Sequence, residues 1–116
     1  MTKNKIIEIL ENYNCNKKEI SVALQLLNIV TLKNVHTGWK PENRISNFYN
    51  YSNYSIFIDI YLDSKFAKVY MYNSNTEEEF TLVEDDLENF VDTIEYDIDD
   101  ITNILNSFSN LNDDRY

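Results

Sequence analysis

Residues 55–63 read SIFIDIYLD, with an aliphatic side chain at every second position. In an extended chain, Ile56, Ile58, Ile60 and Leu62 share one face, and Phe57, Asp59, Tyr61 and Asp63 share the other. Alternation with a period of two over eight residues is typical of a strand with one buried face. We therefore expect a β-strand here, with its aliphatic side packed against the core.

The pattern continues after this strand. A short polar turn at residues 63–65 leads into a second alternating stretch. Its inward residues would be Ala67, Val69 and Met71, and its outward residues Phe66, Lys68, Tyr70 and Tyr72. Another polar turn, at residues 73–75, precedes a third apolar stretch at residues 79–83. Because strands joined by short turns pair antiparallel, residues 54–83 are predicted to form a three-stranded antiparallel meander.

Two short helices are expected before the sheet. Residues 3–13 and about 17–30 both carry apolar side chains at helical spacing. Asn16 precedes the second helix and Glu19 follows three residues later, which is the spacing of a capping box. Residues 1–30 are therefore predicted to form a helical pair.

The segment between the helices and the meander, residues 31–53, shows no clear periodicity. It holds the only glycine and the only proline of the chain, Gly38 and Pro41. Both residue types interrupt regular structure. We predict a loop over residues 31–53.

A long apolar stripe follows the meander. Its members are Leu87, Phe90, Val91, Ile94, Ile98, Ile101, Leu105 and Phe108. Their intervals of one, three and four residues are those of one helix face, and Asp85 or Asp86 could cap the first turn. We predict a helix over residues 85–108 and a polar tail over 109–116. The chain, residues 1–116, is then expected to be a single α+β domain with the element order ααβββα.

Composition limits the possible functions. With one cysteine, Cys15, and one histidine, His36, an intrachain disulfide is excluded and a zinc site lacks ligands. Neither residue has a recognisable catalytic partner, and no phosphate-binding loop, paired-histidine motif or serine elbow is present. No apolar run has the length of a signal-peptide core or a membrane span. We expect a cytoplasmic protein without enzymatic activity, cofactor or metal.

Charge is distributed unevenly along the chain. The formal net charge is −10. Residues 1–46 contain seven basic and four acidic residues, whereas residues 47–116 contain three basic and sixteen acidic residues. Residues 76–100 contain twelve acidic residues and no basic one. Such asymmetry points to a basic partner.

The predicted C-terminal helix would carry an acidic stripe. Asp85, Glu88, Asp92, Glu95 and Asp99 recur at intervals of three and four residues, and Glu77, Glu78, Glu79 and Glu84 precede them. On a helix the five would lie along one side. This surface could imitate a phosphate backbone and dock onto the Lys/Arg-lined channel of a DNA- or RNA-binding protein. The alternative is a solvated face that keeps the protein in solution.

Aromatic residues form a second group. Tyr61, Tyr70 and Tyr72 would make one face of the sheet aromatic, and Trp39 lies in the predicted loop. Tyrosine and tryptophan are enriched at protein interfaces, so these four could anchor a partner. Alternatively, the tyrosines form a second small core under the 31–53 loop, and Trp39 fills a core position. RNA bases could stack on such a face, but the negative charge of this half would repel their phosphates.

The small size, the strong acidity and the Asn/Ile/Lys/Tyr-rich composition resemble those of the small acidic phage proteins that evade host defence, the anti-CRISPR and nucleic-acid-mimic group. These proteins share size, charge and partner class rather than a fold, so no functional residue is carried over. The resemblance implies a phage-encoded inhibitor that acts in the host bacterial cytosol. It would bind a basic nucleic-acid-binding protein, such as a CRISPR effector, and contact neither nucleic acid nor membrane directly.

Two other functions remain open. An immunity protein that neutralises a cationic nuclease toxin would use the same electrostatics. A small helix-turn-helix-like transcriptional regulator would use the N-terminal helices instead, with Lys17, Lys18 and Lys33 on phosphates. The net positive charge of that half is modest, and its second helix has no clear polar recognition face.

Overall fold

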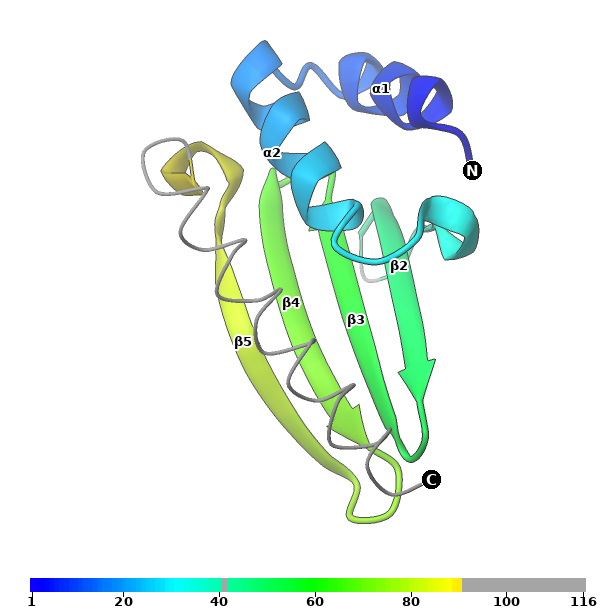
Figure 1. Cartoon of the computed structure of the whole chain (residues 1–116). Coiled ribbons are helices and arrows are strands. Elements are labelled where there is room, and N and C mark those ends of the chain that lie inside the picture. The colour runs from blue at the N-terminus through cyan, green and yellow to red at the C-terminus, as the bar shows by residue number, and fades with distance from the viewer. Residues whose placement is uncertain (41, 91–116) are drawn as a thin grey trace.

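The structure, a computed structural model, describes residues 1–40 and 42–90. Its elements are, in order, α1 (Lys3–Asn12), α2 (Lys17–Leu27), the 3₁₀ turn η1 (Leu32–Asn34), β1 (His36–Gly38), β2 (Arg44–Tyr51), β3 (Tyr54–Tyr61), β4 (Phe66–Asn73), β5 (Glu78–Asp86) and the 3₁₀ turn η2 (Leu87–Phe90). In Figure 1 the two helices lie across one end of a long sheet, so the described part has a helical end and a sheet end.

All five strands form one antiparallel sheet in the order β1-β2-β3-β4-β5. β3 is central, and its Ile58 lies opposite Asn47 of β2 and Val69 of β4. A bulge between Val69 and Tyr70 shifts the register of β4 against β5. The sheet is therefore a continuous up-and-down meander in which β5 lies at one end of the strand order.

The core lies between the helices and one face of the sheet. The aliphatic side of β3 is buried as its alternation predicts, with Ile56, Ile58 and Ile60 at 1 % exposure or less. Ala67 and Val69 of β4 are also fully buried. The helices contribute Ile6, Leu10, Val22, Ala23, Leu26 and Leu27 to the same cluster. The predicted inward side is thus buried in both strands except at Met71, which is half-buried, and of the predicted outward residues Asp59 is buried as well.

Three polar side chains fix the second helix. The Asn16 side chain accepts from the Glu19 backbone N–H at 2.8 Å and the Glu19 carboxylate from the Asn16 N–H at 2.9 Å, which completes the predicted capping box. At the other end, buried Asn47 of β2 donates its side-chain amide to the Leu27 and Thr31 carbonyls. Both ends of α2 are therefore capped by side chains.

The predicted three-stranded sheet is wrong, because the sheet has five strands. The predicted loop over residues 31–53 in fact contains β1 and β2. The inward side of β2 carries Ile45, Asn47 and Tyr49, so a buried amide interrupts the apolar alternation. What makes this segment a strand is its eight-residue pairing with β3. That tertiary contact leaves no periodic signal in the segment itself.

The predicted ααβββα order with a long helix from residue 85 is also wrong at the helix start. Asp85 and Asp86 continue β5, paired with Ala67 and Phe66 of β4. The Leu87 N–H then donates to the Lys65 carbonyl at 2.8 Å, and η2 follows. Pairing with β4 therefore overrides the acidic capping signal. Of the predicted helix, residues 91–108 lie outside the described residues, as does the predicted tail, 109–116.

Because the chain has only one glycine, residues with a Cβ take left-handed backbone positions in the turns. Asn14, Ser52, Lys65 and Glu77 all have a positive φ, between 54° and 63°. Asn tolerates this left-handed region better than most side chains. Lys65 and Glu77 have no comparable local compensation, and they carry the chain through the β3–β4 and β4–β5 turns.

Candidate protein-binding surface

The acidic residues of the last described elements follow the outer strand, and we call this group the acidic edge. It consists of Glu78, Glu79, Glu84, Asp85 and Asp86 of β5 and Glu88 of η2. All six are exposed. Glu77 precedes them in the β4–β5 turn. Asp92, Glu95 and Asp99 lie outside the described residues, so the acidic surface observed here follows a strand and not a helix.

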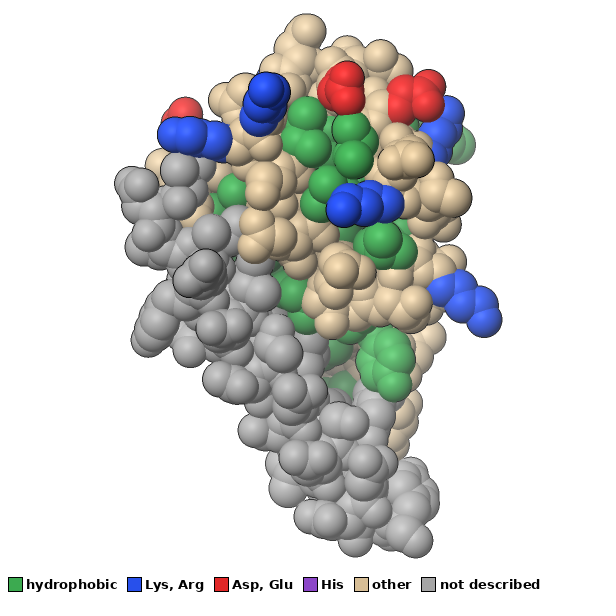
Figure 2. All heavy atoms as spheres, turned by 45° about the horizontal axis from the view of Figure 1, so that its top comes forward, with side chains coloured by type: hydrophobic (Ala, Val, Ile, Leu, Met, Phe, Trp, Pro, Cys, Tyr) green, Lys and Arg blue, Asp and Glu red, His purple; other side chains and the backbone are tan. Residues whose placement is uncertain are grey.

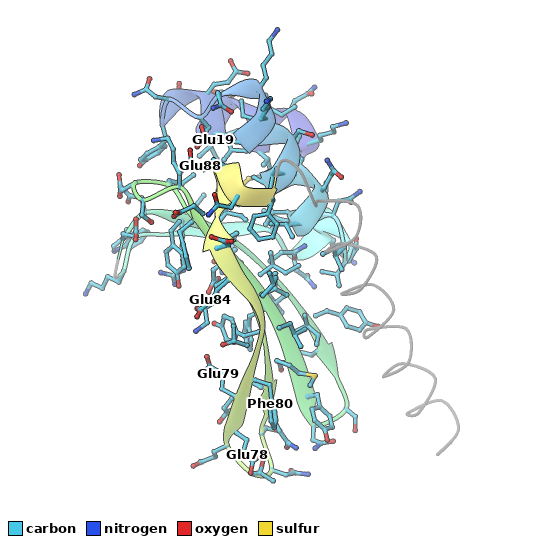
Figure 3. The ribbon with its side chains drawn as sticks, turned by 90° about the vertical axis from the view of Figure 1, so that its left-hand side faces the viewer. Glu19, Glu78, Glu79, Phe80, Glu84 and Glu88 are labelled. Atoms are coloured by element: carbon cyan, nitrogen blue, oxygen red, sulfur yellow. The ribbon has the colours of Figure 1, made fainter. Side chains whose placement is uncertain are left out.

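Strand geometry sorts these acids onto two faces. Glu79 lies opposite Tyr72, Glu84 opposite Lys68, and Asp86 opposite Phe66. These three acids therefore share the sheet face that α1 and α2 do not cover, which we call the open face. Figure 3 shows Glu79 and Glu84 on one side of β5 and Phe80 on the other. Glu78 and Asp85 lie opposite Asn73 and Ala67 of β4, at positions of the other sheet face.

Few of these carboxylates have a cationic partner. Lys68 Nζ lies 3.0 Å from Glu79 Oε1, and this hydrogen bond raises the pKa of Lys68 above its usual value. Among the described residues, the only other ion pair joins Lys5 and Glu8 of α1. Asp85 has a local structural role, because its Oδ1 accepts from the Asp86 N–H and from Asn89 Nδ2. Glu84 lies opposite Lys68 and its charge also raises the pKa of that lysine, but it forms no ion pair with it. Asp86 and Glu88 have no ion pair and no side-chain hydrogen bond within the described part.

The open face also carries the predicted aromatic residues. Tyr61, Tyr70 and Tyr72 all lie on it, and all three are half-buried. Tyr70 stacks on Phe57 with ring centroids 5.1 Å apart, and Tyr61 lies 6.3 Å from Phe66. One alternative placed these tyrosines in a second small core under the 31–53 loop. That segment cannot cover them as a loop, because its strands β1 and β2 belong to the sheet itself. Within residues 1–40 and 42–90, the two helices lie across one end of the sheet (Figure 1).

The open face has a polar centre, of which the sequence pattern predicted only Asp59. Asp59, placed on this face by the alternation, is 7 % exposed. Its carboxylate accepts from the Ser46 hydroxyl at 2.6 Å and from the Tyr70 hydroxyl. Burial raises the pKa of Tyr70 strongly, and the negative charge of Asp59 raises it further. Ser46 was missed because it lies in β2, which the sequence pattern did not reveal.

Trp39 occupies the β1–β2 connection. Its side chain is 72 % exposed, the highest value among the large apolar residues of the described part. It is therefore no core residue, and the interface-anchor alternative remains a prediction. Its neighbour Lys40 lines a pocket on the open face together with Tyr61 and Tyr70.

The helical end has a different electrostatic character. On the face seen in Figure 2, lysine and arginine side chains are scattered around small apolar areas, with acidic side chains among them near the top. α2 buries Val22, Ala23, Leu26 and Leu27 against the rest of the molecule. In the described residues, no His, Cys, Asp or Glu side chains group as a metal site, and neither helix is long and apolar enough to cross a membrane.

No protein-family model matches this sequence, and comparisons with curated proteins and with solved structures give no match.

Proposed function

We propose that this protein is a protein-binding inhibitor that occupies the Lys/Arg-lined groove of a nucleic-acid-binding protein with its acidic edge. The observation that carries the proposal is the shortage of cations around that edge. Of its six carboxylates, only Glu79 forms an ion pair among the described residues, and the single lysine Lys68 faces both Glu79 and Glu84. Unpaired charges of one sign create a field that attracts an oppositely charged surface.

Spacing supports the choice of groove. Glu84 and Asp86 lie two residues apart on the same face of β5. At a rise of about 3.4 Å per residue their backbone positions are about 7 Å apart. Regularly spaced negative charges along an extended backbone are also what a nucleic-acid strand presents to its binding proteins. The acidic edge can thus compete for side chains that normally hold phosphates.

Aromatic side chains supply the apolar part of the contact. Tyr72 lies opposite Glu79 across β4 and β5, and Tyr70 is two residues from it on the same face. Trp39 projects from the β1–β2 connection with most of its surface exposed. Large aromatic residues are frequent energetic centres of protein interfaces. A partner would be attracted by the carboxylates and held by these rings.

A competing explanation of the same acids is protection of the sheet. Charged side chains on an outer strand prevent edge-to-edge pairing with other chains. Protection requires only that the strand be charged, whereas inhibition requires a complementary groove. The two explanations differ in their consequence when the sign of the charge is reversed, because a strand carrying lysines is still protected.

The test measures inhibition of DNA binding. The protein is titrated into purified CRISPR effectors and cationic nucleases, and their binding to DNA is followed by gel shift at about 100 mM salt. We expect loss of DNA binding at a stoichiometric ratio for a cognate effector, and weaker inhibition as salt rises. The double variant Glu84→Lys/Asp86→Lys should lose inhibition. The control Glu8→Lys/Glu11→Lys makes the same charge change on exposed positions of α1 and should retain it.

Each alternative has its own outcome. Inhibition of a nuclease toxin but of no CRISPR effector would identify an immunity protein, which is the second candidate with the same electrostatics. A shift of DNA by the protein alone would support the transcriptional regulator and contradict mimicry. Equal inhibition by the wild type and the Glu84→Lys/Asp86→Lys variant would show that the acidic edge is only a protected strand.

A further inference from the structure

A pocket of about 300 Å³ on the open face has the opposite charge character to the rest of the sheet. Two of its lining residues are basic, Lys40 and Arg44, and a third is His36. Three others are aromatic, Phe57, Tyr61 and Tyr70. Its one acidic lining residue is Asp59. In a chain of net charge −10, this is a local concentration of cationic side chains.

The Asp59 carboxylate already has polar and cationic neighbours. Its carboxylate accepts from Ser46 and Tyr70, and Lys68 lies opposite it on β4. Arg44 reaches Asp59 only through Ser46, because Arg44 Nε donates to Ser46 Oγ at 3.2 Å. No ion pair involves Arg44 in the described residues. Its positive charge is therefore available to another anion.

The Arg44 guanidinium is held in a fixed place. Ser46 binds its Nε on one side, and Gly38 of the neighbouring strand leaves room for it on the other. A Cβ at position 38 would lie 3.0 Å from Arg44 Cζ and 3.1 Å from Nη2. Arg44 Nη1 is buried and has no hydrogen-bond partner in the described residues. A buried donor without an acceptor is costly and calls for an explanation.

We propose that this pocket binds a small aromatic anion of the size and chemistry of a nucleoside monophosphate. Arg44 holds the phosphate, Lys40 adds positive charge, and the ring packs against Phe57, Tyr61 or Tyr70. Guanidinium groups match phosphate oxygens in geometry and charge, and aromatic rings bind bases through their faces. The volume is at the lower limit of small-molecule pockets. The site shares Tyr70 with the proposed protein-binding surface but contains no residue of the acidic edge.

The test is titration calorimetry of the intact chain with AMP, GMP, CMP and UMP at about 50 mM salt, where attraction is only partly screened. The corresponding nucleosides and inorganic phosphate are titrated in parallel. We expect at least one monophosphate to bind with a Kd below about 1 mM, and its nucleoside and free phosphate to bind at least about tenfold more weakly. No binding by any monophosphate, or equal binding by inorganic phosphate, would overturn the proposal.

Three variants localise the binding. Arg44→Gln should weaken it at least about tenfold, whereas Lys33→Gln makes the same charge change on η1, outside the pocket, and should leave it unchanged. Gly38→Ala keeps every charge but pushes on the guanidinium, so it should also weaken binding. Thermal melts show whether each variant is folded. Unchanged affinity in both folded pocket variants would contradict the site. Glu84→Lys/Asp86→Lys should still bind the nucleotide, which separates this site from the acidic edge.

Discussion

The side-chain amide of Asn47 donates a 2.7 Å hydrogen bond to the Leu27 carbonyl at the end of α2. It also reaches the Thr31 carbonyl at 3.1 Å. Asn47 is 1 % exposed and comes from the inward side of β2. One polar group inside the core thus ties the end of the helical layer to the sheet.

Removing this amide should destabilise the protein. Asn47→Leu leaves the two carbonyls without their buried donor, and an unsatisfied buried polar group costs about 1–3 kcal/mol. We expect a loss of that size in the free energy of unfolding, measured by urea titration. Asn50→Ala, at an exposed position of the same strand, should change it by less than about 0.5 kcal/mol. Equal effects of the two variants would show that the Asn47 hydrogen bonds contribute little.

A substitution at Lys65 should stabilise the β3–β4 turn. Its φ of 54° is costly for a residue with a Cβ but not for glycine. Lys65→Gly should therefore raise the free energy of unfolding by about 1 kcal/mol. Lys65→Ala removes the same side chain and charge but retains the Cβ, so it should give no such gain. If alanine stabilised as much as glycine, the gain would come from the side chain and not from the backbone.

Alkaline pH should destabilise the fold through Tyr70. Because its pKa is raised in the folded state by burial and then by Asp59, the folded form keeps a proton that the unfolded chain loses. This contribution is fully present below about pH 10, the unfolded pKa, and is lost as pH rises towards the folded pKa. We expect unfolding free energy to fall above about pH 10.

Tyr70→Phe should flatten that fall, although it lowers stability at neutral pH by removing the hydrogen bond to Asp59. Absorbance titration of the phenolates in the wild type should show a group that ionises well above the ordinary tyrosine range. Tyr61 also has a raised pKa, chiefly through burial, so Tyr61→Phe is the matched comparison. An alkaline fall that is identical in the wild type and Tyr70→Phe would contradict the assignment.

Neutralising part of the acidic edge should separate stability from binding. Glu84→Gln/Asp86→Asn removes mutual repulsion on one face of β5, and like charges on neighbouring positions each cost a few tenths of a kcal/mol. We expect a melting temperature that is unchanged or slightly higher, together with loss of inhibition in the gel-shift titration. Glu8→Gln/Glu11→Gln on α1 is the control. Retained inhibition with the neutral edge would mean that the partner recognises other groups.

The central strands could be read from the sequence because each has one uniformly apolar side. Ile56, Ile58 and Ile60 repeat every second residue and face a single core. The capping box at Asn16 was readable for a similar reason, since both partners lie within three residues. Both features depend on local contacts, which local patterns record.

The other elements depend on distant partners. β2 exists because β3 pairs with it, and its inward Asn47 serves a carbonyl twenty residues earlier. At the other end, Asp85 and Asp86 read as the start of a helix, yet they extend β5 because β4 offers backbone partners. The acidic character of the candidate surface was therefore predictable, but its geometry was not. The cluster of Arg44, Ser46 and Asp59 assembles residues from two strands, one of which had no signal.

The close approach of Gly38 and Arg44 links the residue types that positions 38 and 44 can hold in related sequences. While position 44 keeps an arginine in its present place, a methyl group at position 38 would push the guanidinium by a few tenths of an ångström. A larger side chain at position 38 would require a larger shift of Arg44. Residues 38 and 44 should therefore covary among related sequences. Glycine at position 38 should accompany arginine at position 44.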